Sequence, residues 1–184
     1  MMFGRVAYVV RPPDRRLGPT PCAGREVLRH EDAMQALLDA LPDRYRAFVL
    51  VLRHTELCWI EVAAVRRATA GADGEWIRVA AWGVDRPAGV RFKKLKRADR
   101  YTVPMPPRVR EALTAHLVQY VGSGRDDLVF TDEEGTPLHK QRFRERVWYP
   151  AVEIAGLPSY VDVEDLWTYS GAPRAARPAE VSTL

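Results

Sequence analysis

The fold is decided by two adjoining stretches, which read PDRYRAFVL at positions 42–50 and TELCWIEVAAVRR at positions 55–67. Pro42 suits the first turn of a helix because its missing N–H needs no partner there, and apolar residues at helical spacing follow it. The second stretch also has a helical period, with an apolar face made of Leu57, Ile60, Ala64 and Val65. We therefore predict two buried helices, one from Pro42 to Leu52 and one from Leu57 to Arg67.

The segments before this pair differ in character. Residues 1–28 carry four prolines among basic side chains, a composition typical of an extended linker. From His30 the pattern becomes helical, with an apolar face made of Met34, Leu37, Leu38 and Leu41. The predicted domain thus begins at about residue 29.

After Gly74 the apolar period falls to two, which is typical of strands. Three short strands, which we expect to form one small antiparallel sheet, are predicted over 76–82, 90–92 and 101–103. A helix over 106–120 follows, and a last helix is predicted from Leu138 to Ala155 with a kink at Pro150. This order of elements predicts a mainly helical α+β domain.

Composition limits the classes of function. The 184 residues suit one domain, here predicted over 29–168, and residues 169–184 are expected to form a disordered tail. Cys22 and Cys58 belong to no metal-ligand pattern, so we expect unpaired thiols and neither a metal nor another cofactor. No apolar run is long enough for a membrane span, and we predict a cytoplasmic protein. The formal net charge of +4 favours a polyanionic partner only where the cations cluster.

Four motifs, in order, resemble those of the tyrosine recombinase, or phage integrase, family. The 55–67 stretch resembles T-G-L-R-W-G-E-L-x-x-L-R, and RADRYTVPMP at 97–106 resembles a segment ending in V-P-L-P. LVFT at 128–131 with GTPL at 135–138 resembles V-F-x-x-x-x-G-x-P-L. The stretch 143–158 resembles F-x-x-x-W-x-P-A-x-x-x-A-G-L. The resemblance covers roughly 26–168 and implies the fold of that family's catalytic domain.

In that family a tyrosine attacks a DNA phosphate, and two arginines hold the phosphate oxygens on which charge accumulates. A lysine and a histidine transfer protons. The resemblance implies these roles for four positions, which here hold other residues: Cys58 and Trp167 for the arginines, Leu95 for the lysine and Glu164 for the histidine. We expect the replacements to abolish strand cleavage because such groups act as a unit.

An alternative assignment keeps an active enzyme open. A shifted register over 52–56 would make Arg53 the first arginine, although it loses the match at Trp59, and otherwise Arg53 is expected to be a solvated helix residue. A shift of one residue in the turn would make Lys96 the lysine. The family's nucleophile segment is not expected within the chain. An enzyme that still cleaves would have to use Tyr169, since Tyr160 and Tyr169 are the last tyrosines and both are otherwise expected to be structural or exposed.

Two groups of cations are candidates for DNA contact. The first group lies in the turn before 101–103 and consists of Arg91, Lys93, Lys94, Lys96, Arg97 and Arg100. The second lies at the start of the last helix and consists of Lys140, Arg142, Arg144 and Arg146. The resemblance implies phosphate contact for both, because the corresponding turn and helix approach DNA in the family.

These observations predict a degenerate tyrosine recombinase, of the kind that mobile elements use for DNA integration and recombination. We expect it to bind DNA weakly and without sequence preference, and not to cleave it. One alternative is an interaction module that modulates an intact integrase, and others are the active enzyme above or a decayed gene product without a role.

Overall fold

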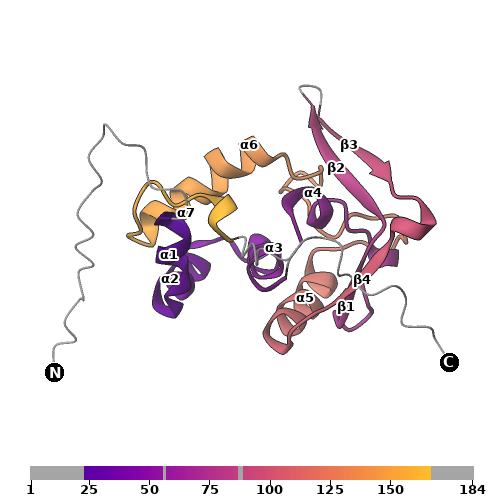
Figure 1. The fold of residues 1–184 in the computed structure, drawn as a ribbon, viewed down its shortest axis with the longest axis horizontal. Helices are drawn as coiled ribbons and strands as arrows, with labels where there is room; N and C mark the ends of the chain where they lie inside the picture. Colours follow the sequence, from indigo (N-terminus) through magenta and orange to yellow (C-terminus); the bar gives the residue numbers. More distant parts are fainter. Residues whose placement is uncertain (1–22, 56, 87–88, 167–184) are drawn as a thin grey trace.

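The computed structural model describes residues 23–55, 57–86 and 89–166 and shows an α+β protein, mostly helical, with small antiparallel two-stranded sheets (Figure 1). The predicted tail over 169–184 and the first 22 residues of the predicted linker lie outside the described residues. Helices α1, α2 and α7 lie at one side of the molecule, α3 lies at its centre, and the strands lie at the other side.

The helices on either side of Pro42 are confirmed as α2 (Glu31–Ala40) and α3 (Asp43–His54). The linker prediction is wrong for its last residues, since α1 (Ala23–Arg29) begins inside it. The side chain of Leu28 is only 1% exposed and belongs to the hydrophobic core, so burial of this one leucine overrides the local polar composition.

The helix predicted over 57–67 is much shorter than expected. Helix α4 (Trp59–Val62) has four residues, and a short 3-10 turn, η1 (Arg67–Thr69), follows after a gap. Between them the Val65 carbonyl accepts a hydrogen bond from the Val129 N–H at 2.9 Å, and Arg66 forms an isolated antiparallel bridge with Leu128. This pairing, remote in sequence, replaces the local helical bonds and ends α4.

The prediction of one three-stranded sheet is also wrong. Strand β1 (Trp76–Val79) pairs with β4 (Tyr101–Pro104), whereas β2 (Ala81–Arg86) pairs with β3 (Gly89–Lys94). The predicted strand over 76–82 therefore divides at Ala80 between two partners. A single bond from the Leu95 N–H to the Ala80 carbonyl, at 2.8 Å, connects the two ladders.

The remaining helices match the predictions closely. Helix α5 (Pro107–Gln119) is followed by a helical run composed of α6 (Lys140–Phe143), η3 (Arg144–Trp148) and α7 (Tyr149–Ile154). The middle part, η3, is a π-helix that ends two residues before Pro150, and Pro150 lies in the first turn of α7, where its missing N–H is tolerated. A last 3-10 turn, η4 (Val163–Leu166), then packs near α1 and α3.

An aromatic cluster joins these elements. Phe48 of α3 is fully buried, and its ring centroid lies 4.8 Å from that of Trp59 in α4 and 5.2 Å from that of Phe130. Phe143 of α6 packs against the same ring at 5.6 Å. The rings of Trp59 and Phe143 also lie 5.1 Å apart, so the cluster packs α4 and the late helix against α3 and against each other.

Candidate functional site

The cations of residues 91–100, which we call the basic segment, are all exposed. They lie on β3 and on the connection from β3 to β4, which includes the 3-10 turn η2 (Arg97–Asp99). Within the described part of the chain, none of these six side chains forms an ion pair with a carboxylate. The segment therefore presents uncompensated positive charge to solvent, next to the single acid Asp99.

Leu95 and Lys96 have opposite environments. Leu95 is half-buried and packs against the hydrophobic core, and its N–H is held by the Ala80 carbonyl. Lys96 is exposed and precedes the turn η2. Of these two, only Lys96 could present a charge to a ligand.

A buried carboxylate connects the basic segment to α4. Glu61 is 1% exposed and accepts a hydrogen bond from the Cys58 N–H at 2.9 Å. Its other oxygen accepts a hydrogen bond from the Tyr101 hydroxyl at 2.5 Å, and Tyr101 directly follows the basic segment. The backbone of Cys58 and the end of the basic segment thus meet through one side chain.

Cys58 lies at the N-terminus of α4 with its side chain buried, only 7% exposed. Its side chain is a small buried thiol, at the position for which the sequence resemblance implies an arginine. It offers neither the permanent charge nor the two parallel N–H donors with which arginine binds a phosphate.

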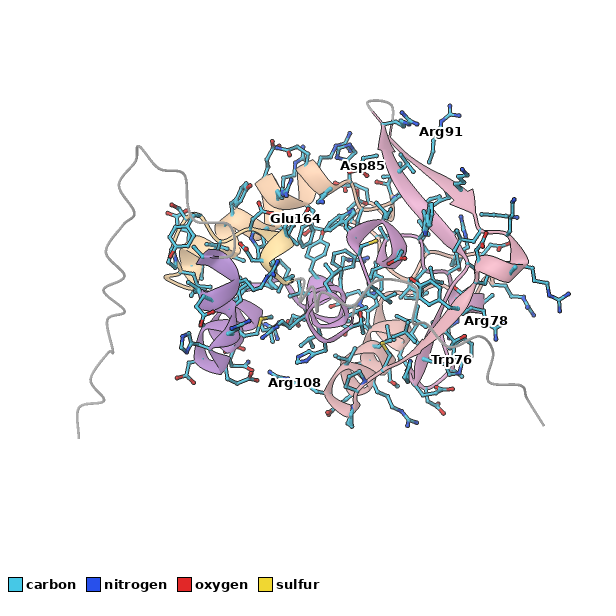
Figure 2. The ribbon with its side chains drawn as sticks, in the orientation of Figure 1. Trp76, Arg78, Asp85, Arg91, Arg108 and Glu164 are labelled. Carbon is cyan, nitrogen blue, oxygen red and sulfur yellow. The ribbon has the colours of Figure 1, made fainter. Side chains whose placement is uncertain are left out.

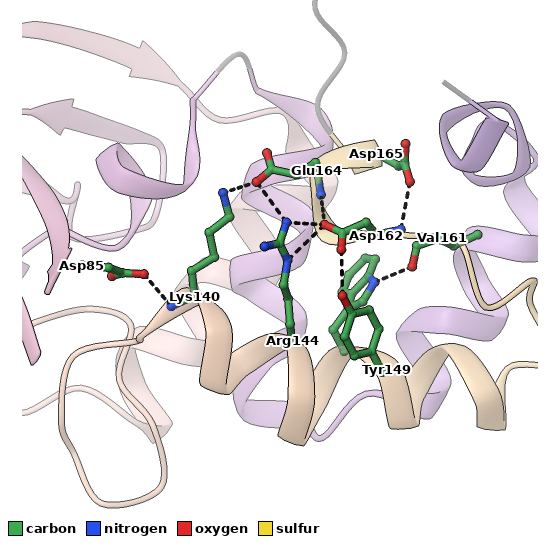
Figure 3. A network of polar contacts seen from close by, with 9 residues as sticks. Asp85, Lys140, Arg144, Tyr149, Val161, Asp162, Glu164 and Asp165 are labelled. Carbon is green, nitrogen blue, oxygen red and sulfur yellow. Dashed lines mark hydrogen bonds and ion pairs between the residues drawn. The ribbon is translucent and has the colours of Figure 1, made fainter. Parts of the chain in front are cut away.

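Glu164 takes part in an ion-pair network with the late helix (Figure 3). Its carboxylate pairs with the ammonium group of Lys140, and it lies 3.4 Å from the guanidinium of Arg144. Asp162 pairs more closely with Arg144, since one carboxylate oxygen accepts bonds at 2.7 and 3.1 Å. The two carboxylates therefore balance the charges of Lys140 and Arg144.

The surroundings of Asp162 favour its charged form. Burial alone would raise the pKa of its carboxyl group, but the Arg144 hydrogen bond, the Glu164 N–H and the Arg144 charge together hold that pKa below its usual value. The Tyr149 hydroxyl donates to its second oxygen at 3.1 Å. Asp162 is thus a fixed anion that holds the segment around η4 against the late helix.

Three further bonds fix this region. The carboxylate of Asp85, on β2, accepts the backbone N–H of Lys140 at 3.0 Å and joins the β2–β3 hairpin to the start of α6. The Trp148 indole N–H donates to the Val161 carbonyl at 3.0 Å. The Asp165 carboxylate accepts the Asp162 N–H at 2.8 Å.

Arg142 and Arg146, the other two cations of the late helix, are exposed. They border a cleft of about 300 Å³ that is also lined by three acids, Asp132, Glu133 and Glu134. The cleft therefore has mixed charge and is a poor site for an anion alone.

Arg53 is not the solvated residue that we expected. Its guanidinium donates to the Leu28 carbonyl at 3.3 Å and so holds the last turn of α1. Tyr160 is half-buried against the core. Trp167 and Tyr169 lie outside the described residues.

Sequence reasoning missed Glu61, Tyr101 and Asp162. The bond between Cys58 and Glu61 spans three positions and has the spacing of a capping box, a local signal that was not used. The Tyr101–Glu61 and Asp162–Arg144 bonds span 40 and 18 positions, and no local pattern marks them. Across the described ranges, no group of three or more His, Cys, Asp or Glu side chains could hold a metal ion. In the same ranges, no helix combines the length and apolar character needed to cross a bilayer.

Comparison with known proteins identifies relatives of this chain. The chain is 31% identical over 147 residues to the prophage phiRv2 integrase of Mycobacterium tuberculosis. The matched stretch covers 79% of this chain and 39% of that integrase. The same values hold for the integrase of a second strain. No family model matches the sequence.

Solved structures agree in fold at low sequence identity. The Tn1549 transposon integrase in complex with transposon right end DNA has a TM-score of 0.62 and 12% identity, over 74% of this chain and 49% of that one. The same integrase with circular intermediate DNA has a TM-score of 0.57 and 13% identity, over 84% of this chain and 53% of the integrase chain. XerA recombinase has a TM-score of 0.53 and 19% identity, over 74% and 46%.

The chain spans less than half the length of the prophage integrases that it matches. Motif order, sequence identity and fold nevertheless agree with one another. The chain is therefore a tyrosine recombinase, or phage integrase, catalytic-domain-like protein, homologous to part of a prophage integrase.

Proposed function

We propose that this protein binds the DNA backbone through the basic segment and does not cleave DNA. The observation that carries the proposal is the set of six exposed cations without carboxylate partners in the described chain. Lysine and arginine side chains on a surface bind DNA by neutralising phosphates and releasing counterions. The similar Tn1549 integrase structures contain transposon DNA, which supports nucleic acid as the polyanion.

The residues at the positions that correspond to the family's catalytic groups argue against DNA cleavage. Phosphoryl transfer requires positive charge at the phosphate oxygens, and removing one such donor costs about 3–4 kcal/mol of transition-state stabilisation. The first arginine position holds the buried thiol of Cys58, and the histidine position holds the carboxylate of Glu164. A carboxylate beside a phosphate repels it.

Binding is tested by the salt dependence of the affinity for a duplex. About four contacts from the basic segment, with one or two from Arg142 and Arg146, give a log–log slope of roughly −4 to −5. The affinity should lie in the non-specific range, on the order of 10⁻⁴ to 10⁻⁶ M. Unrelated duplexes should bind almost equally, since phosphate contacts carry no sequence information.

The decisive variant replaces four residues by glutamine: Lys93, Lys94, Lys96 and Arg97. It should bind more weakly and with a shallower slope, while its melting temperature stays the same because all four side chains are exposed. A control variant with the same net charge replaces, again by glutamine, four exposed arginines outside the basic segment: Arg29, Arg78, Arg110 and Arg125. If both variants lose the same affinity, the basic segment is only a solvated surface. An interaction module for an intact integrase would then become the better explanation.

Cleavage is tested separately with a suicide DNA substrate. We expect no adduct that resists SDS. An adduct that forms with the parent protein and disappears in Tyr169→Phe would instead favour the active enzyme with Arg53, Lys96 and Tyr169.

A further inference from the structure

Lys140 differs from the cations of the basic segment in having a carboxylate already bound to it. Its ammonium group pairs with Glu164, and both side chains remain partly exposed, Lys140 by 28% and Glu164 by 41%. The pair therefore lies at the surface, where a second anion could approach.

We propose that Lys140 is a phosphate-binding residue that the chain occupies with its own Glu164. The incoming ligand is a backbone phosphate of the same DNA, so the inference rests on the proposed function. In the resting protein Glu164 lowers the affinity for DNA in two ways. It neutralises the Lys140 charge, and it places a negative charge where the phosphate must come.

The carboxylates of Asp162 and Glu164 differ in the contacts that hold them. Asp162 is held by Arg144, by the Tyr149 hydroxyl and by the Glu164 N–H. Among the described residues, the Glu164 carboxylate pairs with Lys140 and Arg144 only, and the closer of the two is Lys140. Rotation of the Glu164 side chain therefore uncovers Lys140, while Asp162 keeps Arg144 and the fold of the segment intact.

The position of Lys140 fits DNA bound to the basic segment. The Lys140 N–H is hydrogen-bonded to Asp85 of β2, at 3.0 Å, and Asp85 is paired in the ladder with Val90, the residue before Arg91. Figure 2 shows Asp85 lying between Arg91 and Glu164 in this view. Side chains alternate between the two faces of a strand, so Lys94, paired with Ala81, lies on the same face of the hairpin as Asp85. A duplex backbone bound at Lys94 along this face can therefore also approach Lys140.

The expected effect is one phosphate contact. Each contact contributes about −0.9 to the salt slope, so at ~0.1 M salt one added contact tightens binding by roughly eightfold. Glu164→Gln removes the charge and keeps the shape of the side chain. It should tighten DNA binding about five- to tenfold and steepen the slope by about one.

The control is Glu145→Gln, which makes the same change in net charge on the late helical run that carries Lys140. Glu145 is exposed and accepts a bond from Gln141 at 2.6 Å, and it is paired with neither Lys140 nor Arg144. It should change the affinity by less than twofold. Equal gains for Glu164→Gln and Glu145→Gln would overturn the proposal, because the effect would then be one of net charge.

A double-mutant cycle assigns the gain to Lys140. Lys140→Gln should change the affinity of the parent little, since its charge is already balanced, and should abolish the gain in the Glu164→Gln background. A gain that survives Lys140→Gln would overturn the proposal. The DNA-binding function itself is tested by the quadruple variant of the basic segment, so the two failures are distinguishable. Melting curves of every variant verify that the fold is retained.

Discussion

Tyr101→Phe is the sharpest test of how the basic segment is attached. The change removes one hydroxyl group, which donates to the Glu61 carboxylate at 2.5 Å. Glu61 is 1% exposed, so water does not readily replace the lost donor. Hydrogen bonds to charged groups contribute about 1.5–3 kcal/mol, and we expect the free energy of unfolding to fall by that amount. In a protein of this size the melting temperature should fall by about 2–4 °C for each kcal/mol.

The matched control is Tyr149→Phe. It removes the same atom from a residue that also donates to a carboxylate, Asp162, but Tyr149 is 41% exposed. Because water can satisfy Asp162 at the surface, this variant should lose less than about 0.5 kcal/mol. Urea unfolding of both variants measures the difference. Equal losses would refute the argument that the buried Glu61 carboxylate secures β4 and the end of the basic segment.

Two further predictions concern pH. Burial lowers the pKa of His116, whose Nε2 lies 2.7 Å from the Val129 carbonyl and whose buried Nδ1 has no hydrogen-bond partner in the described structure. The folded state thus binds its proton less readily than the unfolded state, so stability should fall as the pH drops below about 6.5, and His116→Gln should reduce this loss between pH 7.5 and 5 in melting experiments. The pKa of Asp162 is lowered, so its stabilisation should be present above about pH 4 and lost at lower pH. Asp162→Asn should therefore cost roughly 1–3 kcal/mol at pH 7 and progressively less as the pH falls below about 4, and a cost that does not change with pH would show that its charge is not what stabilises the network.

Helices with a long apolar face were predictable from the sequence alone. The faces of α2 and α3 are buried as their spacing predicts, and Pro42 lies between the two helices. The last helix was also predicted, because its apolar residues continue through the π-helical turn. The kink predicted at Pro150 stays a prediction, and the π-helical turn over Arg144–Trp148 was not foreseen from the sequence.

Elements that depend on distant partners were not predictable. Periodicity favours a helix through Val65, but Val65 bonds to Val129 instead, 64 positions later. Trp76–Trp82 alternates as one strand, yet its two halves find different partners on either side of Ala80. In both places the backbone bonds to a segment whose position only the whole fold determines.

The candidate site shows the same division. The basic segment was visible as a run of charges, and its exposure follows from its composition. The pairing of Lys140 and Arg144 with Glu164 and Asp162 was not visible, because it joins residues 18 to 24 positions apart on separate elements. Four cations that looked equivalent in the sequence are thus two balanced and two exposed cations in the structure.

Residues 164–169 read EDLWTY and resemble the family's H-D-L-R-H-T, and the two residues that match this motif, Asp165 and Leu166, support the fold. Leu166 is fully buried, and the Asp165 carboxylate accepts the Asp162 N–H. Asp165 also lies so close to α1 that a Cβ atom at Gly24 would come within 2.0 Å of its oxygen. Neither residue can change without disturbing packing, whereas Glu164 is partly exposed and touches only surface cations through its carboxylate. The packing of this turn therefore depends on Asp165 and Leu166 and not on the side chain at position 164. A substitution at position 164 can change the chemistry of the turn while the turn keeps its fold.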